Sequence, residues 1–165
     1  MSIMAVQTGS ARKHRRGNIG RALDIAEALC RRQGVRLTKL RRAVLELVLE
    51  SGHPVGAYEL LAKLDAHVGA KAPATIYRAL NFLIAHRCVH RIESLNAFIA
   101  CVDLGDPHDS QFMICTDCGN AVEIHDEAIA RALKRQSEKQ GFELSGQIIE
   151  LRGRCTSCQS KQPHA

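Results

Sequence analysis

The sequence predicts an α+β protein in two parts, an N-terminal winged helix-turn-helix domain and a smaller C-terminal α/β domain. Apolar residues recur at three- and four-residue steps through most of residues 19–85, which is typical of amphipathic helices. Two strand-like segments around a turn follow at residues 89–102. Two CxxC pairs then lie among further strand-like segments, where they can close a small domain.

The first three helices are expected to form a small core. The first covers residues 19–33, the second is capped by Thr38 and ends before Gly52, and the third covers about residues 57–67. An apolar stripe on each helix should face the other two. These stripes are Ile19, Leu23, Ala26 and Leu29 or Cys30; Val44, Leu45, Val48 and Leu49; and Leu60, Leu61 and Leu64.

A fourth helix, in the stretch APATIYRALNFLIAHR, is expected to contact DNA. Pro73 suits its first turn, where the missing N–H is not needed. Ile76, Leu80, Leu83 and Ile84 make its buried stripe, which leaves Thr75, Tyr77, Arg78 and Asn81 on other faces. Such side chains can reach phosphates and base edges in a major groove, although most polar helix faces are only solvated.

The stretch CVHRIESLNAFIACV predicts a β-hairpin, the wing. Its strands are expected around a turn at Ser94–Ala97. Counting outward from the pair Glu93 and Phe98 places His90 opposite Cys101, with Cβ atoms ~5 Å apart. Both side chains would then be within reach of one ion.

The polar stretch DLGDPHDS predicts a hinge before the C-terminal domain. Strands are expected in QFMIC, AVEI and FELSGQIIELRGRC, with a helix from Glu127 to Gln140 that Gly141 ends. A unit of about sixty residues is only marginally stable without a staple. The expected boundaries are a basic, flexible extension at 1–18, the winged-helix domain at 19–102, the hinge at 103–110 and the C-terminal domain at 111–165.

Charge is divided unevenly along the chain. Residues 1–92 contain 16 Lys and Arg against 6 Asp and Glu, whereas residues 93–165 contain 7 against 11. The basic half favours a polyanionic partner, because these side chains displace counterions from nucleic-acid phosphates. A solvated tail does not explain the basic residues among helical patterns, which are Arg36, Lys39, Arg41, Arg42, Lys71 and Arg78. We expect DNA contacts from Lys39, Thr75, Tyr77, Arg78 and Lys71.

The sequence suggests neither secretion nor membrane insertion. No apolar run follows the basic residues near the start, and no stretch approaches the about 20 apolar residues that cross a bilayer. We therefore expect a cytoplasmic protein. In a reducing cytoplasm, paired cysteines hold metal or do redox work more often than they form structural disulfides.

Four of the seven cysteines form two similar pairs, in CTDCG at 115–119 and CTSC at 155–158. Two such thiolate pairs can close a tetrahedral Zn(II) site that has no open position. Disulfides and a redox dithiol are the alternatives, but a redox CxxC usually opens a helix, and the first pair follows a strand-like run. We expect a structural zinc at Cys115, Cys118, Cys155 and Cys158.

A second metal site is expected where the wing meets the hinge. His90 and Cys101 of the hairpin would be joined by His108 of the hinge and Glu123 of the strand after the first CxxC. These residue types can all ligate zinc, and a site built partly from the hinge would couple metal occupancy to the angle between domains. Each residue alone also has an ordinary structural explanation, and His125 is a possible substitute ligand.

The stretches VRLTKLRRAVLELV, APATIYRALNFL and CTDCG...CTSC resemble successive hallmarks of the ferric uptake regulator family of bacterial metal-responsive repressors. The resemblance extends from about residue 20 to about residue 160. The chain is most similar to the zinc uptake regulators, because the stretch HDSQFMIC has one histidine where the iron-sensing branch has a cluster. His90, Cys101, His108 and Glu123 match the sensory site of the zinc branch.

The resemblance implies a homodimer that associates through its C-terminal domains. Its zinc-loaded form would bind double-stranded DNA at an AT-rich inverted repeat and repress zinc-uptake genes, with one structural and one regulatory Zn(II) per subunit. Alternatives are a family member that senses iron, manganese or peroxide, a structural zinc module, and a metalloenzyme. No Ser/His/Asp pattern or phosphate-cradling glycine loop supports an enzyme or a small organic substrate.

Overall fold

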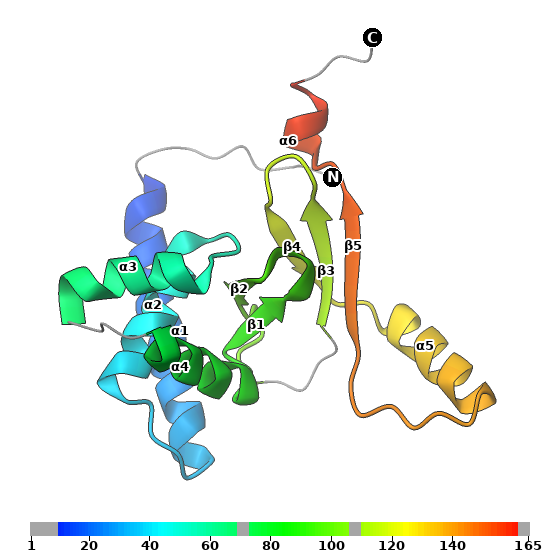
Figure 1. The fold of residues 1–165 in the computed structure, drawn as a ribbon, viewed down its shortest axis with the longest axis horizontal. Helices are drawn as coiled ribbons and strands as arrows, with labels where there is room; N and C mark the ends of the chain where they lie inside the picture. The colour runs from blue at the N-terminus through cyan, green and yellow to red at the C-terminus, as the bar shows by residue number, and fades with distance from the viewer. Residues whose placement is uncertain (1–9, 69–72, 106–109, 162–165) are drawn as a thin grey trace.

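The computed structural model describes residues 10–68, 73–105 and 110–161, and it confirms the predicted α+β architecture (Figure 1). The helical part contains α1 (Ser10–Arg32), α2 (Lys39–Ser51), α3 (Ala57–Val68), α4 (Pro73–Ala85) and the wing strands β1 (Val89–Ile92) and β2 (Ala97–Ala100). The C-terminal part contains β3 (Ser110–Cys115), β4 (Ala121–Ile124), α5 (Glu127–Lys139), β5 (Ile148–Gly153) and α6 (Thr156–Gln159). Figure 1 shows the wing between the helices and the C-terminal sheet.

The four long helices of the helical part bury the predicted apolar stripes in one core. Val89 and Phe98 of the wing belong to the same core, so the wing is packed onto the helices. Leu49, Leu61 and Ile84 are only partly buried at its rim. The buried stripe residues are Ile19, Leu23, Ala26, Leu29, Cys30, Val44, Leu45, Val48, Leu60, Leu64, Ile76, Leu80 and Leu83.

The helix ends agree with the sequence where a capping residue marks them. Thr38 Oγ1 accepts a hydrogen bond from the Arg41 N–H at 3.4 Å, and Gly52 closes α2 with a φ of 64°. The start of α1 was predicted wrongly, at Ile19 instead of Ser10. Residues 10–18 carry no apolar stripe, so periodicity could not reveal a helix there, whereas several of them are good helix formers.

The wing has a register two residues away from the predicted one. His90 pairs with Ile99, not with Cys101. The turn begins one residue earlier than expected, in a 3₁₀ turn at Glu93–Leu95, because Asn96 takes the left-handed conformation with a φ of 46°. Side chains alternate along a strand with a period of two, so this shift leaves His90 and Cys101 on the same face.

The C-terminal sheet has the strand order β4-β3-β5, with β3 antiparallel to β4 and parallel to β5. One face meets the wing in a second apolar cluster, formed by Ile92, Ile99, Phe112, Ile114 and Ala121. The predicted long strand FELSGQIIELRGRC is a strand only from Ile148, and α6 was not predicted. Ser145 and Gly146, which favour turns, precede β5.

The first residues of the predicted hinge are held to the helical part. The Gly105 N–H donates to the Arg87 carbonyl at 3.2 Å. Gly105 has a φ of +83°, which favours glycine, and a Cβ there would lie 2.7 Å from Leu29 Cδ2, so any other residue would also displace the Leu29 side chain. Residues 106–109 lie outside the described ranges. None of the helices in the described part of the chain has the length and apolar character that crossing a bilayer requires.

Candidate metal centres and DNA interface

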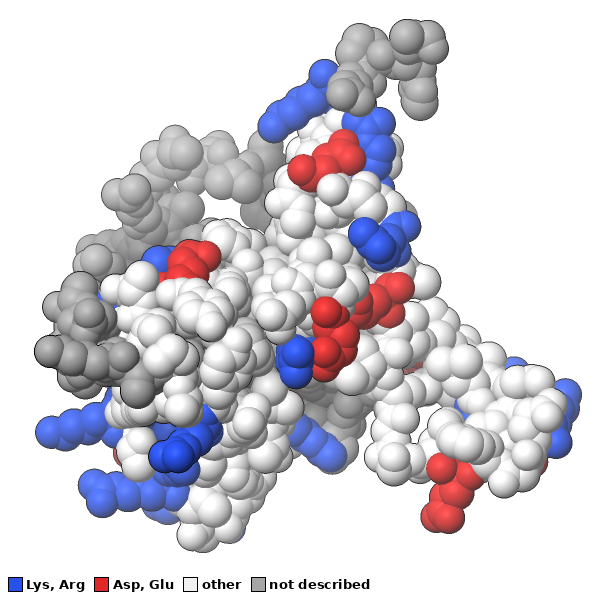
Figure 2. All heavy atoms as spheres, in the orientation of Figure 1, with Lys and Arg blue, Asp and Glu red and all other residues white. Residues whose placement is uncertain are grey.

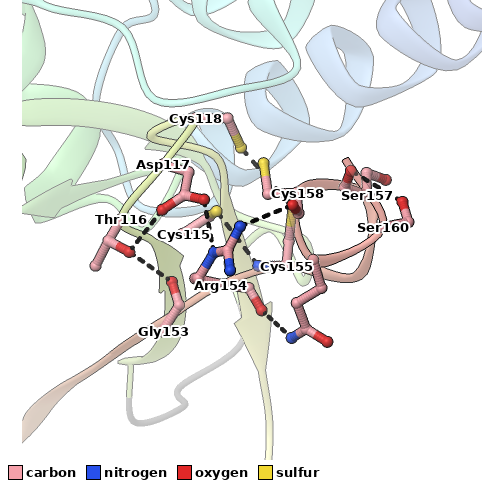
Figure 3. Close-up of polar contacts among 11 residues, drawn as sticks. Cys115, Thr116, Asp117, Cys118, Gly153, Arg154, Cys155, Ser157, Cys158 and Ser160 are labelled. Atoms are coloured by element: carbon pink, nitrogen blue, oxygen red, sulfur yellow. Dashed lines mark hydrogen bonds and ion pairs between the residues drawn. The ribbon is translucent and has the colours of Figure 1, made fainter. Parts of the chain in front are cut away.

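Two loops bring the four paired cysteines together at one end of the sheet (Figure 3). Cys115 ends β3, and Cys155 follows β5. Because β3 and β5 run parallel, with Cys115 paired to Gly153, both strands deliver their CxxC loops to the same end. The four Sγ atoms of Cys115, Cys118, Cys155 and Cys158 all lie within 4.8 Å of one another. Convergence on one point favours a single four-ligand ion over separate disulfides or a redox dithiol.

The surroundings of these thiols favour partial ionisation. The Cys155 N–H donates to Cys115 Sγ at 3.3 Å, and this bond, with hydrogen bonds from Cys118 and Asp117, lowers the pKa of Cys115 to about 6. Hydrogen bonding to the Cys155 thiol raises the pKa of Cys158 to about 12. The cluster thus shares its remaining protons, which a Zn(II) ion bound by four thiolates would displace.

Arg154 ties the two CxxC loops together, as Figure 3 shows. Its Nε donates to Asp117 Oδ2 at 2.7 Å, and its Nη2 donates to the Cys158 carbonyl at 2.9 Å. The guanidinium also places positive charge beside the cysteines, which as four thiolates around one Zn(II) would carry more charge than the ion. Groups of this kind orient metal ligands, but no spacing rule in the sequence singled out Arg154.

A second group of candidate ligands lies between the wing and the sheet. His90 is on β1, Cys101 directly follows β2, and Glu123 is on β4. Their ligand atoms lie within 4.8 Å of one another, and His90 Nε2 is 2.9 Å from Glu123 Oε1. The side chains of His90 and Glu123 are only 11% and 6% exposed. The structure therefore brings together three of the four residues predicted for the second site.

The remaining candidate ligands for this site were His108 and, as a substitute, His125. His108 lies outside the described residues, so its place stays a prediction. Among the described residues, His125 belongs to neither group of candidate ligands.

Neighbouring groups orient these three side chains. Ser110 Oγ is 3.0 Å from His90 Nδ1, which directs Nε2 toward Glu123, and the Val102 N–H donates to Glu123 Oε2 at 3.0 Å. Burial, with the Glu123 charge second, raises the pKa of Cys101 to about 12. A bound cation would instead lower the pKa of this thiol, because its positive charge favours the thiolate. Ser110 gave no signal in the sequence, because only the fold places it beside His90.

Helix α4 carries three of the residues that were expected to contact DNA, and after that expectation we call it the reading helix. Arg78 is exposed, whereas Thr75 and Tyr77 are half-buried, with Tyr77 packed against the helical core. Lys39 is exposed at the start of α2. Lys71 lies outside the described residues. Lys39 and Arg78 are therefore the freest of these side chains to reach a ligand.

Two of the other basic side chains are engaged within the fold. Arg42 pairs with Glu27 at 3.2 Å, and Arg41 stacks over the Phe82 ring at 3.5 Å from its centroid. Tyr58, on the first turn of α3, is 72% exposed. It was not among the residues expected to contact DNA. Its position outside the apolar stripe of that helix was the available signal.

Comparison with known proteins decides the family. The model of the ferric uptake regulator family matches residues 32–152. The chain belongs to this family. The zinc uptake regulation protein of Escherichia coli (strain K12) is 36% identical over 134 residues, which cover 81% of this chain and 78% of that protein. The ferric uptake regulation protein of Campylobacter upsaliensis is 28% identical over 144 residues, covering 84% and 90%.

Solved structures of the family give a further finding about conformation. A zinc uptake regulator complexed with zinc and DNA matches with a TM-score of 0.83 at 34% identity, covering 87% of this chain and 96% of that one. XcZur matches with a TM-score of 0.77 in its holo form but 0.50 in its apo form, both at 40% identity. These alignments cover 84% and 85% of this chain and 96% and 97% of the XcZur chains. Because the identity is equal, the present structure has an arrangement closer to the holo form.

Replacing Cys118 by serine should remove the zinc bound by the four-cysteine cluster and unfold or monomerise the protein. Metal binding to such a small unit is part of its folding free energy, so loss of one thiolate destabilises the whole C-terminal part. Zinc content after mild chelation, thermal unfolding and sedimentation would measure this. Ser157→Ala, in the other CxxC motif but not one of the four ligands, should match the parent. A dimeric Cys118→Ser variant with unchanged melting temperature would contradict the assignment.

Proposed function

We propose that this protein is a zinc-responsive transcriptional repressor, whose zinc-loaded homodimer binds an AT-rich inverted repeat and represses zinc-uptake genes. The observation that carries the proposal is the convergence of His90 and Cys101, from the wing, with Glu123, from the C-terminal sheet. An ion bound there would join the two parts of the chain. The zinc uptake regulation protein of Escherichia coli and the regulator complexed with zinc and DNA support this function. Since DNA is the target, its place of action is the cytoplasm.

Two zinc ions per subunit fit the two groups of ligands. The four-cysteine cluster is a closed structural set, which leaves no coordination position for catalysis. The regulatory set is His90, Cys101 and Glu123, with His108 as the fourth ligand. A cysteine ligand favours zinc over manganese, which prefers oxygen ligands, so a thiolate in the regulatory set argues against a manganese sensor.

The regulatory residues are placed where they can control the reading helix. Val89 and Phe98 of the wing pack in the same core as α4, so His90 and Cys101 move with the reading helix. Glu123 moves with the sheet. Holding all three together fixes the angle between the two parts of each subunit. In a dimer that angle sets the separation of the two reading helices, which must match half-sites about one helical turn, ~34 Å, apart. In a flexible dimer only a fraction of the molecules has the separation that DNA binding needs. Its apparent DNA affinity is therefore lower.

The apolar surface of the C-terminal part supports a homodimer. Met113 pairs with Val122 on β4 and with Leu151 on β5, so the three side chains form a row on the sheet face opposite to the wing. They are 50%, 55% and 46% exposed. Further exposed apolar residues on or near α5 are Leu133, Phe142 and Leu144. An exposed apolar row on a sheet face favours a protein interface, and β5 is an edge strand of the described sheet that a second copy can pair with.

Basic side chains of the helical part support a DNA partner. Figure 2 shows Lys and Arg projecting together from the helical part at the lower left of the view. Arg78 is exposed on the reading helix. Side chains of this kind hold phosphates and, from a helix in the major groove, read guanine edges.

Cys101→Ser should keep the four-cysteine zinc, the fold and the dimer, yet lose most zinc-dependent DNA binding. The substitution removes one regulatory ligand and none of the structural ones. DNA affinity across a buffered zinc series would measure the response. Cys30→Ala, which removes a buried thiol outside both clusters, serves as the control. If Cys101→Ser keeps the midpoint and amplitude of the parent, the regulatory site is elsewhere.

Arg78→Ala should weaken binding to the preferred AT-rich duplex by about 1–3 kcal/mol and relax base preference, if Arg78 makes a bidentate base contact. Titrations with the preferred duplex and with a random duplex separate the two effects. Arg135→Ala removes the same charge from an exposed position on α5 and should leave both affinities near the parent values. Equal losses on the two duplexes would mean that Arg78 contacts phosphates only.

Leu151→Glu should convert the dimer to monomers, because a charge on the apolar sheet face would be buried without a partner. Sedimentation of the zinc-loaded protein would measure the change. Tyr58→Glu adds the same charge at an exposed residue of the helical part and should sediment like the parent. A dimeric Leu151→Glu variant would place the interface on another surface.

A further inference from the structure

The turn of the wing is attached to the C-terminal sheet by one carboxylate. Glu150 of β5 accepts hydrogen bonds from two successive backbone amides, from Glu93 N–H at 2.7 Å through Oε1 and from Ser94 N–H at 3.1 Å through Oε2. These amides open the 3₁₀ turn Glu93–Leu95, where N–H groups have no partner within the turn. Glu150 thus caps the wing turn from a strand 56 or more residues further along the chain.

This contact favours a charged, well-held side chain. Burial raises the pKa of Glu150, but the Ser94 hydroxyl and the two amides together hold it below the usual value. Hydrogen bonds to an ionised acceptor are about twice as strong as neutral ones. The half-buried position of Glu150 further limits competition from water.

Glu150 stands in register with the regulatory ligand Glu123. Phe112 of β3 pairs with Glu123 on β4 and with Glu150 on β5, so the three residues form one row across the sheet. This row lies on the face that meets the wing, because Phe112 packs against Ile92 and Ile99 there. Glu123 lies at the open end of the wing, beside His90 and Cys101, and Glu150 lies at its turn.

We infer that Glu150 is a positioning residue for the regulatory metal site. By holding the wing turn on β5, it keeps His90 and Cys101 within reach of Glu123, and it does so without touching the ion. A hairpin fixed at its turn and packed at its centre has little freedom left at its open end. Metal binding there then needs less ordering of the chain, which raises affinity. The inference rests on the proposed regulatory site.

The test is the Zn(II) affinity of the regulatory site, measured by chelator competition without DNA on dimers that already hold the four-cysteine zinc. Glu150→Ala should weaken that affinity about tenfold, in the range found for groups that orient metal ligands. Glu150→Gln should have a smaller effect, because its amide keeps one acceptor oxygen. Glu93→Gln is the matched control, since it removes one charge from the same turn but keeps the Glu93 N–H. Amide hydrogen exchange at residues 93 and 94 should be faster in Glu150→Ala and unchanged in Glu93→Gln.

The possible outcomes separate this inference from the proposed function. Faster exchange at the turn with unchanged zinc affinity would overturn the positioning role while leaving the regulatory site intact. Loss of the four-cysteine zinc or of the dimer in both Glu150 variants would also overturn it, because the role would then be general stability. A parent protein that binds no second Zn(II) would instead overturn the proposed regulatory site.

Discussion

The contact between the wing and the β4-β3-β5 sheet is the interaction on which the arrangement of the molecule depends. Its centre is apolar, with Ile92 and Ile99 against Phe112. Its two ends are polar, because Glu123 meets His90 at one end and Glu150 holds the turn at the other. Apolar packing alone would allow the hairpin to slide on the sheet, whereas hydrogen bonds at both ends set its direction and position.

The two ligand clusters differ in what they connect. The four cysteines of the first cluster all belong to the C-terminal part, so an ion bound there would strengthen one folding unit. The second cluster takes His90 and Cys101 from the wing and Glu123 from the sheet, so an ion bound there would join two units. The closer match to the holo than to the apo form of XcZur agrees with a chain in its joined arrangement.

Several features could be predicted because a short segment of sequence determines them. Helical periodicity identified the buried stripes, Thr38 identified a helix start, and the CxxC spacing identified the four-cysteine cluster. The second cluster was predicted from a hairpin register that proved wrong by two residues. His90 and Cys101 are close together nevertheless, because a shift of two preserves the face of a strand, whereas a shift of one would have separated them.

By itself, the sequence determined the order of the long helices and the strands, the apolar stripes and the four-cysteine cluster, since each depends on residue type and spacing within one segment or on a repeated motif. Only the tertiary structure decided that Ser110 supports His90, that Arg154 spans both CxxC loops, and that Glu150 caps the wing turn. Glu93 and Glu150 are separated by 57 residues, and no local period relates them. Their contact exists because the parallel pairing of β3 and β5 places Glu150 on the face of the sheet that receives the wing.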